Sequence, residues 1–209
     1  MKRRHLLLVC VACALLGGCQ TKKDVPPVLT VSAAECIATP VLDSSVPMTF
    51  DGKKKSTQSL EISASSSCLT DTQGRRRLFR LLRLPGGDIP YTVSVASLAH
   101  GYTVFAPHFM LLNARGETVR EIDPQTLMFR SGSLTGIFRP RAGERYLLIV
   151  SNPDAVGKRF SRTVENMTAT MVAAGGAFFH IYSGDDTTNS FVYSHAGEIV
   201  ITVYPVPTS

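Results

Sequence analysis

The chain has 209 residues, 44% of them hydrophobic and 18% charged, a composition typical of a folded globular protein and not of a disordered one. The formal net charge is +6, but Lys2, Arg3 and Arg4 lie in a leader-like segment with no acid before Cys19. Removing these three from 22 leaves 19 basic against 16 acidic residues, a net charge of +3, which is too mild to indicate nucleic-acid binding.

The first residues have the features of a bacterial lipoprotein leader. Residues 1–5 are positively charged and residues 6–16 are apolar, a run well short of the ~20 residues that a membrane-spanning helix needs. Residues 16–19, Leu-Gly-Gly-Cys, match a lipobox, whereas an ordinary signal peptide needs no cysteine there. We predict cleavage after residue 18 and anchoring through acyl chains on Cys19. The residue after Cys19 is Gln20 and not the aspartate that resembles an inner-membrane retention signal. This favours a location in the outer membrane, facing the periplasm.

Two cysteines remain after the leader and the anchor are set aside. Cys10 and Cys13 leave with the leader, so their C-x-x-C spacing is not a redox motif. Cys36 and Cys68 form a single pair in an oxidising compartment, which favours a disulfide worth roughly 3–4 kcal/mol. Two buried free thiols are the alternative. A metal site is not expected, because two cysteines without a neighbouring histidine supply too few ligands.

The segment after the anchor is a predicted tether, so we divide the chain into residues 1–18 (signal peptide), 19–45 (lipidated N-terminus and tether) and 46–209 (one β domain). Residues 28–38 fit either a strand or a short helix, and residues 59–64 alternate like a half-buried strand. Lysines 53–55 and arginines 75–77 flank strands. They indicate solvated turns at strand ends, or else a contact with anionic lipid headgroups.

The stretch 90–122 predicts two or three consecutive strands. Tyr91, Val93 and Val95 alternate with polar residues, and residues 104–112 are apolar on both faces, as in a strand that is covered on both sides. Pro107 cannot donate to a ladder and predicts a bulge or an edge position.

The second half of the chain continues the β pattern with one exception. Residues 127–130, 134–138, 146–150, 178–182 and 197–204 are strand candidates, and residues 183–186 have loop composition. Residues 159–174 predict a helix, because Phe160, Val164, Met167 and Met171 recur at helical spacing. The predicted fold is an all-β, jelly-roll-like antiparallel sandwich of about eight to nine strands with this one short helix.

Several of these motifs together resemble the maltose-operon periplasmic protein family. They are the Leu-Pro-Gly turn at 84–86, the Tyr-x-Val-x-Val strand at 91–95, Val-Phe-Ala-Pro at 104–107, the Leu-x-Ala-x-Gly strand end at 112–116, the Tyr-Leu-Leu-Ile-Val strand at 146–150 and the closing His-x-Gly-Glu at 195–198. The resemblance covers residues 45–207. The chain is also similar to small β-sandwich modules at the C-termini of secreted bacterial peptidases. The resemblance implies a periplasmic accessory role in maltose and maltodextrin handling, and it transfers no catalytic residue.

No catalytic motif or cofactor motif is found in the sequence. His195 beside Ser194 suggests a hydrolase pair, but neighbouring residues of a strand point to opposite faces, which favours a loop or strand-end histidine. Asp185 and Asp186, with Asp123, lack the dense spacing of calcium loops and indicate a solvated turn.

Carbohydrate recognition needs an aromatic platform with polar neighbours. The candidate ligand-binding residues for such a platform are Tyr102, Tyr182, Asp185, Asp186, Phe191 and Tyr193, with Asn189 close to them in sequence. The alternative is that these aromatic residues pack loops onto the sandwich. The chain contains no Trp, which argues against tight maltodextrin binding.

The sequence therefore predicts a non-enzymatic, cofactor-free lipoprotein, held to the membrane by acylated Cys19. It would assist maltodextrin uptake through weak glycan binding or through contact with a porin or a binding protein. The competing hypothesis is a structural or envelope-assembly lipoprotein that binds a protein partner and no sugar.

Overall fold

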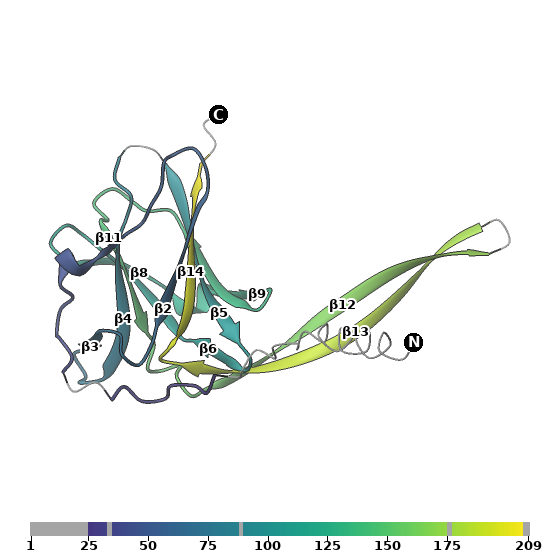
Figure 1. The fold of residues 1–209 in the computed structure, drawn as a ribbon, viewed down its shortest axis with the longest axis horizontal. Coiled ribbons are helices and arrows are strands. Elements are labelled where there is room, and N and C mark those ends of the chain that lie inside the picture. The colour runs from purple at the N-terminus through teal and green to yellow at the C-terminus, as the bar shows by residue number, and fades with distance from the viewer. Residues whose placement is uncertain (1–24, 33–34, 88–89, 175–176, 207–209) are drawn as a thin grey trace, which may run out of the picture.

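The computed structural model describes residues 25–32, 35–87, 90–174 and 177–206. They form two packed β-sheets (Figure 1), which confirms the predicted all-β sandwich. The first sheet has six strands: β1 (Val46–Pro47), β4 (Arg76–Arg83), β11 (Tyr146–Ser151), β7 (Pro107–Leu112) and β8 (Thr118–Ile122) in spatial order, with β3 (Cys68–Thr70) also on β4. Cys19 lies outside the described residues.

The second sheet has eight strands. Its spatial order is β12 (Arg159–Ala174), β13 (Ala177–Ser194), β6 (Thr103–Phe105), β5 (Tyr91–His100), β10 (Ser133–Phe138) and β9 (Met128–Arg130), and β14 (Gly197–Pro205) pairs with both β5 and β2 (Ser56–Ile62). Two short 3-10 helices, η2 (Leu42–Ser44) and η3 (Pro124–Thr126), complete the described elements. The described residues thus form fourteen strands, more than the eight to nine expected, because short segments such as β1 and β3 also pair.

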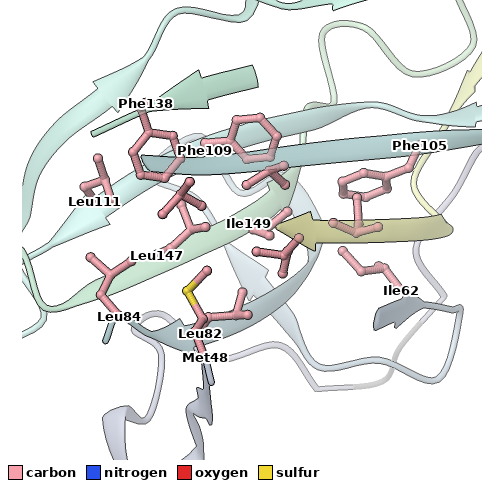
Figure 2. Packing of buried hydrophobic residues seen from close by; sticks show 14 of the residues in the cluster. Met48, Ile62, Leu82, Leu84, Phe105, Phe109, Leu111, Phe138, Leu147 and Ile149 are labelled. Carbon is pink, nitrogen blue, oxygen red and sulfur yellow. The ribbon is translucent and has the colours of Figure 1, made fainter. Parts of the chain in front are cut away.

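The core lies between the sheets, as alternation along the strands requires. In β11, Leu147 and Ile149 join the cluster that also holds Phe105 and Phe109, and Figure 2 shows these side chains gathered in one layer. Leu148, the residue between Leu147 and Ile149, belongs to a separate cluster on the other face of the first sheet. Both faces of this sheet therefore carry apolar residues.

The apolar run 104–112 is divided into two strands that belong to different sheets. β6 ends at Phe105, and β7 begins at Pro107 and pairs with β11. Pro107 faces Ser151 of β11, whereas the pairing of β7 with β8 starts only at Phe109. Pro107 is thus the first residue of its strand and has no partner on the β8 side, which agrees with the predicted edge position and not with a bulge.

The predicted helix at 159–174 is wrong. These residues form β12, which pairs with β13 in antiparallel register from Arg159↔Val192 to Ala174↔Ala177. The predicted loop at 183–186 is wrong as well, since it lies inside β13. Together the two strands form a long hairpin that projects away from the sandwich (Figure 1).

The N-terminal segment is fixed to the sandwich at two places. Cys36 and Cys68 form the predicted disulfide, and Ile37 makes a parallel bridge with Leu69 of β3. Further upstream, the Thr103 hydroxyl donates to the Val25 carbonyl at 2.8 Å. The part of the predicted tether that the structure describes, from Val25 onward, is therefore bound to the sandwich, and residues 19–24 lie outside the described residues.

Candidate functional site

A groove of about 500 Å³ lies on the outer face of the first sheet. Its floor consists of outward-facing apolar side chains from neighbouring strands: Leu69, Met110, Leu112, Leu148 and Val150. The N-terminal segment at residues 38–40 and the residues Gly116, Thr118 and Glu121 complete this part of the lining. The volume falls within the range of small-molecule sites.

One end of the groove carries a chain of three charged or titratable side chains. Arg77 of β4 is buried, and its Nε donates to the Ser151 carbonyl at 3.0 Å. Its Nη2 lies 2.8 Å from His108 Nδ1, and His108 Nε2 lies 2.9 Å from Glu121 Oε2. A guanidinium only donates, so His108 Nδ1 accepts and His108 Nε2 carries the proton that is donated to Glu121.

The electrostatics of this chain keep His108 neutral near pH 7. Burial lowers the pKa of His108, and the Arg77 charge lowers it further, while the Glu121 carboxylate opposes both effects. Burial also lowers the pKa of Arg77, but a guanidinium stays protonated in a protein. The groove therefore offers a fixed positive charge, a neutral imidazole and a carboxylate beside an apolar floor.

Arg75 adds a second charged group at the same end. Its Nε contacts Asp71 at 2.8 Å and its Nη1 contacts Asp154 at 2.6 Å. Hydrogen bonds from this side chain and nearby backbone N–H groups hold the pKa of Asp71 below its usual value, although desolvation opposes them. The prediction that residues 75–77 form a solvated turn is thus wrong for Arg77 and only partly right for Arg75.

A second hollow, of about 540 Å³, lies where the N-terminal segment crosses the ends of β2, β5 and β14. Val25, Pro26 and Val28 form part of its lining. His100 Nε2 and Glu198 Oε2 lie 2.9 Å apart at its polar side. This hollow adjoins the root of the β12–β13 hairpin, because the Val28 N–H donates to the Ser194 hydroxyl at the end of β13.

The proposed aromatic platform is divided between two regions. Phe191 is buried and Tyr193 is half-buried, and Phe160 stacks between them with ring centroids 5.4 Å and 4.7 Å away. Burial raises the pKa of the Tyr193 phenol. Tyr102, in the turn between β5 and β6, is 41% exposed, and its carbonyl accepts from the Val192 N–H. These contacts match the packing alternative for Phe191 and Tyr193.

The other candidate residues lie farther out on the hairpin. Tyr182 pairs with Ala169, Asp185 with Asn166, and Asp186 with Glu165. Tyr182 is nine positions from Phe191 along one strand, a separation of about 30 Å. A single sugar-binding surface therefore does not join Tyr182 to Phe191.

His195 lies in the two-residue connection between β13 and β14, which confirms the predicted loop or strand-end position, but its side chain is closed to solvent. It is buried, and its Nδ1 lies 2.7 Å from the Ser151 hydroxyl. Burial and the Arg77 charge lower the pKa of His195. The Ser151 hydroxyl also accepts from the Leu78 N–H and has no solvent exposure. The pair is thus closed to any substrate arriving from solvent, and it links the two sheets.

The described part of the chain offers neither a metal centre nor a membrane-spanning helix. Within it, no group of three or more His, Cys, Asp or Glu side chains is placed to hold a metal ion. Asp123 caps η3 by accepting from the Gln125 N–H. The helices in that same part are too short to cross a bilayer.

Sequence reasoning missed the groove residues Arg77, His108 and Glu121. The available signal was the alternation after the arginine triplet, because Arg77, Phe79 and Leu81 share one face of β4. Neither a scan against protein-family models nor a search of curated proteins finds a match to this chain.

Proposed function

We propose that the protein is an outer-membrane lipoprotein, facing the periplasm, that assists maltose and maltodextrin uptake by weak glycan binding and catalyses no reaction. The lipobox at Cys19 supports the proposed localisation, and the resemblance to the maltose-operon family supports the proposed class of ligand. The groove over Met110, Leu148 and Val150 is the observation that carries the binding role.

The chemistry of the groove suits a sugar. Apolar C–H faces of a pyranose ring pack on the floor at Met110, which is only partly buried, and hydroxyl groups pair with Glu121, His108 and Arg75 at the rim. Among the described residues, the groove lining includes no Phe, Tyr or Trp side chain. Stacking on aromatic rings is therefore missing, and we expect weak binding.

Calorimetry tests this proposal directly. Residues 19–209 carrying Cys19→Ser would be titrated with maltose and with longer maltodextrins. We expect saturable heat that grows stronger with chain length. Glu121→Gln should weaken the affinity roughly fivefold, because it removes one charge-assisted hydrogen bond. Glu117→Gln is the matched control, since Glu117 pairs with Arg115 and does not line the groove.

Absence of heat at millimolar sugar rejects glycan binding in the groove. The anchor is tested separately: labelled palmitate should be incorporated into the full chain and not into its Cys19→Ala variant. Equal labelling of that variant would reject acylation at Cys19.

An envelope-assembly role that involves a protein partner and no sugar is the second candidate. It is favoured by β12, whose pairing in the described part of the chain is with β13 alone. An edge of this kind can accept a strand from another protein. A photo-crosslinker at position 163 should then give one defined adduct in cells, and the same group at exposed Ile137 should give none.

A further inference from the structure

We propose that the distal part of the β12–β13 hairpin, residues 169–174 and 177–182, docks at the interface of the lipid bilayer. We call these residues the hairpin tip. The inference rests on the proposed anchor at Cys19 and adds a second membrane contact made by the folded domain itself.

The composition of the hairpin tip differs from that of the rest of the hairpin. Its two ranges read ATMVAA and AFFHIY and contain no Asp, Glu, Lys or Arg. The register places Val172 opposite Phe179 and Thr170 opposite Ile181. In the described part of the chain, the tip strands pair only with each other, and Met171 is 61% exposed. A two-stranded hairpin is marginal in water by itself, and exposed apolar surface of this kind marks an interaction site.

The N-terminal segment leaves the sandwich at the root of the same hairpin. Thr103 pairs with Val192 of β13, and its hydroxyl donates to the Val25 carbonyl at 2.8 Å. Only six residue steps separate Val25 from Cys19, a reach of at most about 22 Å. The hairpin root is therefore held close to the membrane surface by the anchor.

The length of the hairpin fits this placement. β12 has sixteen residues, which extend about 50 Å. Figure 1 shows the two strands leaving the sandwich together, well beyond the packed sheets. Because the arm is longer than the tether, rotation about the tether brings the hairpin tip to the bilayer while the sandwich stays in water.

The depth of insertion follows from the backbone. Six residues at the tip extend about 20 Å, less than the ~30 Å hydrocarbon core. Hydrocarbon also does not tolerate the unpaired N–H and C=O groups at the outer edges of a hairpin. The tip therefore occupies the interface, where aromatic residues are favoured.

Acidic residues limit the contact to the tip. Glu165 pairs with Asp186 four positions behind the Ala169↔Tyr182 pair at the base of the tip, and Asp185 is next to Asp186. Carboxylates there repel anionic headgroups, so binding should not require anionic lipid. The lysines at 53–55 cannot substitute for the tip, because they lie at the far end of β2. They precede Ser56, the first residue of β2, whereas Ile62 at the other end of this strand pairs with Gly197 near the hairpin root.

Tryptophan fluorescence tests the proposal, because the chain has no Trp of its own. Phe179→Trp would be introduced into residues 19–209 with Cys19→Ser, so that no acyl chain is present. On addition of phosphatidylcholine vesicles we expect a blue shift and quenching by lipids brominated near the headgroup. Tyr204→Trp, at a 42% exposed position on β14, is the control and should show neither change.

A pair of double variants gives a second readout. Phe178→Ser with Phe179→Ser should weaken vesicle co-sedimentation at least about tenfold, since two large apolar side chains are lost from the contact. Val119→Ser with Ile137→Ser, two exposed apolar positions on the sandwich, should leave it unchanged.

The proposal is overturned if the emission of the Phe179→Trp variant ignores vesicles, or if it shifts with protein concentration alone, which would indicate self-association through the tip. Binding that needs anionic lipid and survives the double tip variant would also overturn it. These outcomes are distinct from failure of the anchor or of sugar binding, which palmitate labelling of the Cys19→Ala variant and the calorimetry report independently.

Discussion

The sandwich and the β12–β13 hairpin contain the same type of secondary structure but are stabilised in different ways. Central sandwich strands such as β7 and β11 bury a face against the opposite sheet, so that Phe109 and Ile149 have no solvent exposure. β12 pairs only with β13 within the described residues, and Met171 near its end is 61% exposed. Buried surface maintains the first region, whereas the second extends beyond the packed sheets toward an external surface. The comparison separates a scaffold that carries a groove from an arm that reaches away from it.

The largest expected effect is a difference in the free energy of unfolding between a variant at a core phenylalanine and a variant at a phenylalanine of the hairpin tip. Phe109→Ala should lower the free energy of unfolding by about 3–5 kcal/mol, because it leaves a cavity between the sheets. Phe178→Ala in the free protein should change it by less than about 0.5 kcal/mol, because the hairpin tip pairs with no sandwich strand among the described residues. Chemical denaturation of both variants measures the contrast, and equal losses would contradict the division into scaffold and arm.

Removal of the disulfide should have the next largest effect on stability, and it also tests the division into sandwich and hairpin. Replacing both Cys36 and Cys68 by Ser should lower the free energy of unfolding by about 3–4 kcal/mol, since the closed loop no longer restricts the unfolded chain. A reducing agent should destabilise the wild type by a similar amount and leave the double variant unaffected. Vesicle binding by the hairpin tip should survive the substitution, because the disulfide lies on β3.

The smallest expected effect is a pH dependence that belongs to the sandwich. Burial lowers the pKa values of His108 and His195 in the folded state. In the unfolded chain, a histidine has a pKa of about 6.5. The unfolded state therefore binds more protons below that pH, and stability should fall as the pH drops from 7 to 5. Thermal denaturation across this window should show a shallower slope for His195→Gln, and an unchanged slope would exclude His195 as a source.

A tyrosine gives the matching effect at high pH. Burial raises the pKa of Tyr91 to about 12, from about 10 in the unfolded chain. The stability contributed by the neutral phenol should thus be lost as the pH rises from 10 toward 12. Tyr91→Phe should flatten the decline in thermal denaturation across this range, although it also removes the hydrogen bond from the phenol to the Pro85 carbonyl.

The sandwich was predictable because its signal is local. Tyr91, Val93 and Val95 alternate with polar residues in the sequence, and they occupy one strand whose two valines are buried. Turn residues between such segments fix their lengths, so most of the strands were located within a few residues. The disulfide was equally accessible, since Cys36 and Cys68 were the only pair left.

The hairpin was misread because apolar residues at 160, 164, 167 and 171 fit a helical stripe. On β12, Phe160 and Val164 occupy one face by position and Met167 and Met171 the other. A competing signal was present in the β-branched residues of the same segment (Thr163, Val164, Thr168, Thr170, Val172) and in the Gly-Gly that follows it.

The groove was not predictable from the sequence for a different reason. Arg77, His108 and Ser151 lie on three different strands. The buried Arg77 finds its hydrogen-bond partners, the Ser151 carbonyl and His108 Nδ1, on the two other strands. Local composition suggested a solvated arginine triplet, and only the sheet order brings His108 and Ser151 to Arg77. Alternation along β4 indicates which face Arg77 occupies, but no pattern in a single sequence shows that His108 and Ser151 lie beside it.

Hydrogen exchange measured with and without phosphatidylcholine vesicles tests the central claim most directly, on residues 19–209 with Cys19→Ser. The account predicts that amides in the hairpin tip exchange much faster than those of β5, β11 and β14 in the free protein, and that vesicles slow the tip alone. Tip amides already as protected as the sandwich without vesicles, or unaffected by vesicles, would contradict the claim that the hairpin is an arm for an external surface.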